Sequence, residues 1–206
     1  MDYGHDTEFL RCIPPRARPT HGPRPGLTAL ALMWALLAAQ GLWAQSPKPT
    51  DYDVKAVYLY NFGRFVDWPA SVIAKSDSFN VCVLGQDPFG PALDATLAGE
   101  TIGGKSVAAK RISNPPEAVR CQIVFISSVE DSRFNKIIEA LDREAVLTVS
   151  DMPQFSQRGG MIQFVLEGKK VRFEVNLTAV HRAGLTLSSE LLKVATTVRG
   201  SRSPGD

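Results

Sequence analysis

Residues 79–84 read Phe-Asn-Val-Cys-Val-Leu, and residues 121–126 repeat the pattern as Cys-Gln-Ile-Val-Phe-Ile. Each run is apolar over the length of a short strand, and Gly85 follows the first run directly. Short apolar runs with flanking turn residues are typical of strands that are buried on both faces of a sheet. The two runs therefore predict buried strands in a sheet that helices cover.

Further strands and helices alternate along the chain outside these two runs. The sequence predicts strands over 106–112 and 145–149 and a hairpin whose arms are 161–166 and 171–175. Helices are expected over 52–66, 91–97, 177–183 and 189–198, and from Ser127 or Ser128 to Leu141. This order predicts an α/β fold: a single three-layer domain with a mixed β-sheet of about five to six strands, flanked by helices, and a hairpin in its C-terminal half.

The helix expected over 52–66 is apolar on most of its circumference. Asp51 is positioned to cap its start, and Pro69 ends it because proline disfavours helical angles in Trp68 before it. A helix of this kind must be covered on more than one side. Two interpretations remain open: a central core helix, or a helix shared with a second subunit.

The first 44 residues differ from the rest of the chain. Arginines and prolines fill residues 11–25, the apolar run Leu-Thr-Ala-Leu-Ala-Leu-Met-Trp-Ala-Leu-Leu-Ala-Ala covers 27–39, and the small residue Ala44 follows. This pattern predicts a signal peptide with a long basic leader over 1–44, since the apolar run is short for a membrane span; an uncleaved anchor is the alternative. The α/β domain is then expected over 45–198 and a disordered tail over 199–206.

Composition narrows the possible classes of protein. The chain has 206 residues, of which 44% are hydrophobic and 21% charged, and its formal net charge is +2. These fractions are those of a globular protein and exclude wholesale disorder and collagen-like repeats. The near-neutral balance gives no basis for a nucleic-acid partner, which usually requires a basic face.

Two of the three cysteines, Cys82 and Cys121, lie in the part of the chain that follows the leader. An even pair in an exported protein is typical of a disulfide. A disulfide that closes the loop between these two cysteines would stabilise the fold by about 4 kcal/mol in the chain-entropy description. Two buried free thiols are the alternative.

The sequence contains no motif of an established catalytic class. A P-loop, a dinucleotide-binding glycine pattern and a nucleophile elbow are all absent from it, and His181 is the only histidine after the leader. Asp87, Asp131 and Asp151 are expected near strand ends, where they could bind Mg²⁺ or act as acid and base. The favoured interpretation is that they form caps and turns. We therefore expect no enzyme, no cofactor and no metal site.

Six residues are candidates for ligand or partner contact. His181 with Arg182, and Arg64 near the end of the first helix, could bind an anion, although such residues are more often solvated or interface charges. Glu174 and Asn176 share one face of the last strand by the period of two. Trp68 completes the set, as the aromatic residue between the first helix and Pro69.

Several strings, taken in their order and spacing, resemble the YfiR/HmsC-type family of periplasmic proteins. The resemblance covers residues 52 to about 198 and rests on the strings at 54–62, 65–69, 81–85, 121–127, 146–151, 159–162, 171–176 and 183–192. They include Lys55-Ala56 within the first string and Phe65-Val66-Asp67-Trp68-Pro69 as the second.

The resemblance implies a small α/β domain that forms a homodimer in the periplasm. It also implies inhibition of an inner-membrane diguanylate cyclase through its periplasmic domain, and so control of cyclic di-GMP and biofilm formation, with an outer-membrane lipoprotein as a further partner. The family disulfide corresponds to Cys82 and Cys121. Some members carry a second cysteine pair near the Gly-Gly segment; this sequence has none there, so redox sensing through that bond is not implied.

A different class of function remains as an alternative. The domain could be a periplasmic small-molecule binding module that uses the loops around Asp87 and Asp151, or the basic residues Arg64 and Arg182. A weaker possibility is that it forms the sensing part of a larger assembly.

Overall fold

The structure is a computed structural model and describes residues 48–200. The predicted signal peptide over 1–44 lies outside the described residues, as does the tail from residue 201 onward. Within 48–200, no helix has both the length and the apolar character needed to cross a membrane.

An eight-stranded mixed sheet forms the centre of the domain, in the order β10-β8-β7-β6-β5-β2-β4-β3. Neighbours run parallel from β4 through β2, β5 and β6 to β7, whereas β7 and β8 form the antiparallel hairpin. The strands are β2 (Phe79–Leu84), β3 (Thr101–Ile102), β4 (Lys105–Ile112), β5 (Ile123–Ile126), β6 (Leu147–Ser150), β7 (Ile162–Glu167), β8 (Lys170–Asn176) and β10 (Thr197–Arg199). A separate pair joins β1 (Val66–Asp67) to β9 (Thr186–Leu187).

The predicted α/β class is confirmed, and the number of strands is larger than expected. The additional members of the sheet are the short edge strands β3 and β10, which pair with β4 and β8. A strand of two or three residues is too short to show an alternating apolar pattern. Its formation depends on pairing with the neighbouring strand, which the local sequence does not reveal.

The helices are α2 (Asp51–Phe65), α3 (Ala70–Ala74), α4 (Pro91–Leu97), α5 (Phe134–Ala140), α6 (Leu177–Arg182) and α7 (Ser189–Val194). Two 3₁₀ helices, η2 (Pro115–Arg120) and η3 (Ser128–Arg133), precede β5 and α5. The prediction of one helix up to Leu141 was therefore wrong in its first part, which is η3.

The helix expected over 189–198 was too long. It ends at Val194, and the chain then enters β10, which includes Arg199 from the expected tail. The sequence Thr196-Thr197-Val198 consists of β-branched residues, which favour extended backbone, and the N–H of Thr196 donates to the carbonyl of Phe173 at 2.9 Å. Pairing with β8 therefore takes these residues out of the helix.

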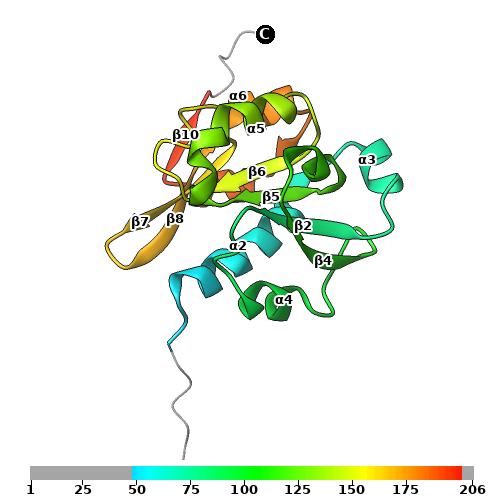
Figure 1. Cartoon of the computed structure of the whole chain (residues 1–206), viewed down its shortest axis with the longest axis horizontal. Helices are drawn as coiled ribbons and strands as arrows, with labels where there is room; N and C mark the ends of the chain where they lie inside the picture. Colours follow the sequence, from blue (N-terminus) through cyan, green and yellow to red (C-terminus); the bar gives the residue numbers. More distant parts are fainter. Residues whose placement is uncertain (1–47, 201–206) are drawn as a thin grey trace, which may run out of the picture. The chain divides into compact units, whose positions relative to one another are not determined.

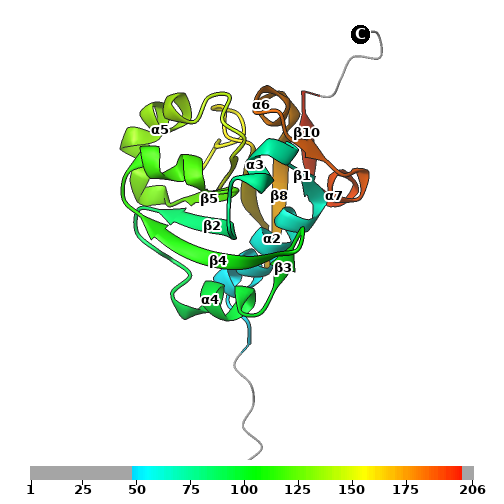
Figure 2. The same ribbon diagram turned by 90° about the vertical axis from the view of Figure 1, so that its right-hand side faces the viewer.

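Helices cover both faces of the sheet, as the predicted three layers require. Val81 and Val83 of β2 face the layer of α2 and α4, whereas Cys82 and Leu84 face α5 and η2. Figures 1 and 2 show α2 and α5 on opposite sides of the central strands. Alternation with a period of two thus produces two apolar clusters, one on each face.

Helix α2 begins at a capping box that differs from the predicted cap. Thr50, not Asp51, is the N-cap, and the Thr50 hydroxyl accepts from the N–H of Asp53 while the Asp53 carboxylate accepts from the N–H of Thr50. Phe62 is fully buried and packs against Phe164 and Phe173. The opposite side of α2 keeps apolar residues at the surface: Val54, Val57 and Phe65. The buried side of α2 agrees with the interpretation as a core helix. Its exposed apolar side leaves the interpretation as a helix shared with a second subunit open.

Candidate functional site

Glu174 and Asn176 lie on β8, and the structure places them in one hydrogen-bond cluster with Ser156 and Gln163. The Ser156 hydroxyl donates to Glu174 Oε2 at 3.0 Å, and the Ser156 N–H donates to Gln163 Oε1 at 3.1 Å. Asn176 Nδ2 donates to the carbonyl of Ser156 at 2.9 Å. These bonds fasten the segment that contains Gly159-Gly160 to the hairpin. In this chain, hydrogen bonds therefore hold the Gly159-Gly160 segment against the β7–β8 hairpin.

His181 and Arg182 form the last turn of α6, directly after the cluster. The Asn176 carbonyl oxygen Oδ1 accepts from the N–H of Ala179 and caps this helix. His181 and Arg182 are both exposed, and Arg182 Nη1 lies 3.6 Å from Asp142 Oδ1. The Arg182 cation in the last turn complements the helix dipole, so part of its placement is structural.

Arg64 and Trp68 lie at the opposite end of α2 from its capping box. The exposed Arg64 guanidinium lies 5.9 Å from the ring centroid of Tyr60. Trp68 packs edge-on against Phe79, and its indole nitrogen is buried without a hydrogen-bond partner. Within the described part of the chain, no hydrogen bond or ion pair joins Arg64 or Trp68 to the other four candidates. The contact role of these six residues stays a prediction.

The three strand-end aspartates are each neutralised by a different cation. Asp87 pairs with Arg111 at 2.8 Å, Asp131 with Arg158 at 2.5 Å and Asp151 with Lys55 at 2.6 Å. The Asp87 carboxylate also accepts from the N–H of Phe89 at 2.8 Å, as a turn former does. Across residues 48–200, no cluster of three His, Cys, Asp or Glu side chains is arranged to hold a metal ion.

Asp151 contributes to a groove at the carboxyl end of β6, the edge of an α/β sheet where ligands usually bind. Its Oδ2 accepts from Lys55 Nζ at 2.6 Å and from the Tyr52 hydroxyl at 2.9 Å. Lys55 Nζ also lies 4.1 Å from the centroid of the Tyr52 ring. The groove has a volume of about 470 Å³, and its lining comes from α2, the residues after β6, and β7: Asp51, Tyr52, Lys55, Asp151, Pro153, Gln163, Phe164, Val165 and Leu166.

Tyr52 is the titratable group most affected by this environment. Burial, followed by its hydrogen bond to Asp151 and the negative charge of that carboxylate, raises the pKa of Tyr52 to about 12. Each of these factors disfavours the phenolate. The phenol therefore remains a hydrogen-bond donor to Asp151 far above neutral pH.

Sequence reasoning singled out Asp151 but not Tyr52 or Lys55. Lys55 lies 96 residues before its partner, and nothing local to α2 specifies the carboxylate that it meets. A usable signal exists: Lys55 is a lysine within an otherwise apolar stretch, and Tyr52 stands three residues before it on the same helix face. Ser156 and Gln163 carry no comparable signal.

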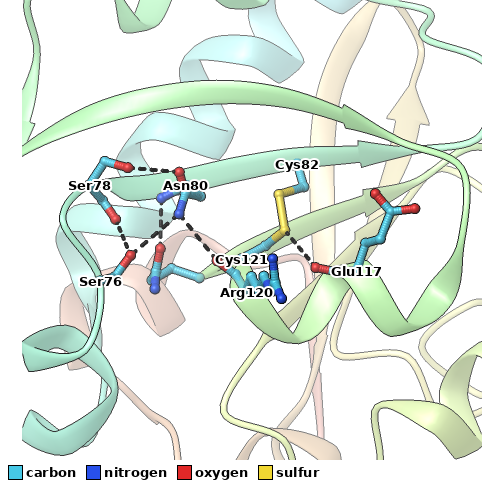
Figure 3. Close-up of a disulfide and its surroundings, with 8 residues drawn as sticks. Ser76, Ser78, Asn80, Cys82, Glu117, Arg120 and Cys121 are labelled. Carbon is cyan, nitrogen blue, oxygen red and sulfur yellow. Dashed lines mark hydrogen bonds between the residues drawn. A yellow bond between two sulfur atoms is a disulfide. The ribbon is translucent and has the colours of Figure 1, made fainter.

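Cys82 and Cys121 form the expected disulfide between β2 and the start of the segment that leads into β5 (Figure 3). Their Cα atoms lie 6.0 Å apart, and both side chains are buried. Beside this bond, the N–H of Asn80 donates to Gln122 Oε1 at 2.6 Å, and Asn80 Nδ2 donates to the carbonyl of Arg120 at 3.2 Å. The covalent bond and these hydrogen bonds hold the same two segments together.

Comparison with known proteins identifies the family. A family model described as YfiR/HmsC-like matches residues 52–196, nearly the whole described domain. The chain belongs to the YfiR/HmsC-like family. The resemblance noted in the sequence is thereby confirmed. The family is regulatory, non-catalytic and periplasmic.

Two solved structures are similar to the chain at low identity. A conserved domain protein from Vibrio cholerae O1 biovar El Tor strain N16961 is 11% identical with a TM-score of 0.48, over 73% of this chain and 60% of that chain. The ABC domain from Streptococcus pneumonia, in complex with L-Trp, is 11% identical with a TM-score of 0.42, over 58% of this chain and 55% of that one. This YfiR/HmsC-like chain thus spans about 60% of the first structure.

Proposed function

We propose that this protein is an exported periplasmic regulator that inhibits an inner-membrane diguanylate cyclase by binding the cyclase's periplasmic domain. It thereby controls cyclic di-GMP signalling and biofilm formation. The observation that carries the proposal is the YfiR/HmsC-like match over residues 52–196. The Cys82–Cys121 disulfide supports it, because structural disulfides persist in oxidising compartments such as the periplasm.

The side chains of the domain favour contact over catalysis. The strand-end carboxylates are held in ion pairs, which suits structural positions more than acid–base roles. Val54 and Val57 stand three residues apart on one exposed face of α2, and Leu166 is exposed on the hairpin. Exposed apolar side chains of this kind are available for a protein partner.

The proposal extends to the quaternary state and to a second partner. A homodimer is expected, with the exposed apolar side of α2 available for its interface. An outer-membrane lipoprotein would relieve the inhibition. Arg64, Trp68, Glu174, Asn176, His181 and Arg182 remain the candidate contact residues for these partners.

Deletion and direct binding test the central claim. In the native organism, deletion of the gene should raise cyclic di-GMP, and additional deletion of the membrane cyclase should abolish the rise. Calorimetry should detect binding between the purified domain and the purified periplasmic domain of that cyclase. An unchanged cyclic di-GMP level together with a flat calorimetric trace would overturn the proposal.

A further inference from the structure

Strand β7 is paired on both sides only at its beginning. Its ladder with β6 ends at the pair Ser150–Gln163, whereas its ladder with β8 continues to Glu167–Lys170. Figure 1 shows the β7–β8 hairpin extending beyond the end of β6, with the start of α2 close by. Beyond the pair Ser150–Gln163, no further pair joins β7 to β6 in the described part of the chain, so the side of β7 that faces β6 is an open strand edge at Leu166.

The hydrogen-bond pattern identifies the free groups on this edge. The N–H of Asn176 donates to the carbonyl of Met161 at 2.8 Å, so the odd-numbered residues of β7 exchange bonds with β8. In an antiparallel pair the alternate residues turn their N–H and C=O groups to the other side. Leu166 therefore directs both of its backbone groups away from β8, beyond the last residue of β6. Unpaired edge groups of this kind are templates for an added strand.

The open edge forms one wall of the groove described above. Phe164, Val165 and Leu166 line it on this side, and Tyr52 and Lys55 of α2 line it on another. The Leu166 side chain is 57% exposed, whereas Phe164 is buried against α2. The groove thus combines backbone hydrogen-bonding groups with an apolar side chain that lacks cover.

We propose that an extended segment of the partner protein binds here as an added strand beside residues 164–167. Of the charged residues that line the groove, Asp51 and Asp151 are carboxylates and Lys55 is the ammonium, which is already held by Asp151. This charge balance favours a segment with a lysine or arginine that reaches Asp51, and an apolar residue that packs on Leu166. The inference rests on the proposed function, since the segment belongs to the periplasmic domain of the cyclase.

Two substitutions at one position separate the backbone from the side chain. Leu166→Pro removes the edge N–H and leaves the ladder with β8 intact, because proline is tolerated where the N–H faces outward. Leu166→Thr keeps the N–H and the preference for a strand. In calorimetry with the purified cyclase domain, L166P should weaken binding about tenfold or more, and L166T by clearly less.

Two measurements that do not use L166P keep the test decisive if that variant does not fold. Amide hydrogen exchange at residues 164–167 should slow when the cyclase domain is added. Asp51→Asn should weaken binding and reduce its dependence on salt. Unchanged exchange at 164–167, or equal affinity of folded L166P and wild type, would overturn the inference and leave the proposed function standing.

The remaining outcomes are also decisive. Absence of binding by the wild-type domain would overturn the inference, and together with an unchanged cyclic di-GMP level after deletion of the gene it would also overturn the proposed function. A shift from dimer to monomer in L166P, with cyclase binding unchanged, would assign the edge to a second copy of this chain. Competition for the groove by a small molecule, with no exchange protection by the cyclase domain, would assign it to a small ligand. Each of the last two results overturns the inference.

Discussion

The Lys55 ammonium lies 2.6 Å from Asp151 Oδ2 and joins the first turns of α2 to the carboxyl end of β6. The two side chains are only 7% and 16% exposed, and the Tyr52 hydroxyl donates to the same carboxylate oxygen. Removing two charges from water is costly unless the ions meet with good geometry and further hydrogen bonds. Here both conditions hold, so the pair fixes the position of α2 relative to the sheet.

Loss of the ammonium alone should destabilise the domain strongly. Lys55→Met leaves the Asp151 carboxylate largely buried, with Tyr52 as its remaining side-chain donor, and should lower the free energy of unfolding by about 3 kcal/mol. Urea denaturation provides the measurement. The double variant K55M/D151L, which removes both charges, should recover part of the loss. If K55M were as stable as wild type, the pair would have no structural role.

Tyr52 should titrate later than an ordinary tyrosine. Its pKa is raised to about 12, whereas the usual value is about 10. Because the protonated form is favoured in the folded state, its stabilising contribution is complete below the ordinary pKa and is lost as the pH rises through about 12. A phenolate absorbance titration should show a late step that Tyr52→Phe removes. A Y52F curve identical to that of wild type would contradict this assignment.

The sequence predicted the elements whose signal is local. The apolar run at 79–84 coincides with β2, and the turn at Glu167-Gly168-Lys169 correctly places the hairpin. Strands β3 and β10 escaped prediction because pairing with a neighbour, not their own composition, makes them strands. The pairing of β10 with β8 shows how a partner elsewhere in the chain can decide local structure.

The candidate site likewise contains residues that the local sequence predicted and residues that it did not. Asp151 and the pair Glu174–Asn176 followed from strand-end position and from the period of two. Their partners Lys55 and Ser156 did not, because these contacts span 96 and 18 residues and depend on how α2 and the Gly-Gly segment fold back onto the sheet. Period and position place a side chain on a face, but they do not identify the side chain that it meets.

The disulfide should account for a large part of the stability. Replacement of Cys82 and Cys121 by alanine should lower the free energy of unfolding by about 4 kcal/mol, the chain-entropy value for this loop. Denaturation with and without a reductant gives the measurement. The reductant should bring wild type to the level of the double variant and leave that variant unchanged. Equal stability of oxidised and reduced wild type would contradict the prediction.

Arg111 joins β4 to α4 through an ion pair that should weaken in acid. Its guanidinium donates to both carboxylate oxygens of Asp94, at 2.8 and 2.6 Å, and these hydrogen bonds lower the pKa of Asp94. A carboxyl group with a lowered pKa stabilises the fold above its ordinary pKa, about 3.9 in the unfolded chain. That contribution is lost as the pH falls through the lower folded value. Since Asp94 is more than half exposed, solvent screening keeps the effect small.

Thermal unfolding of Asp94→Asn beside wild type measures this contribution. The asparagine keeps the shape of the side chain without its charge, so the variant should unfold at a lower temperature near neutral pH. The difference should shrink as the pH falls below about 4, since wild type then loses the same charge. Glu190→Gln is the matched control, because its partner Lys193 lies on the exposed surface of α7 and the pair adds little. A difference between D94N and wild type that stays constant down to the acid limit would contradict the assignment.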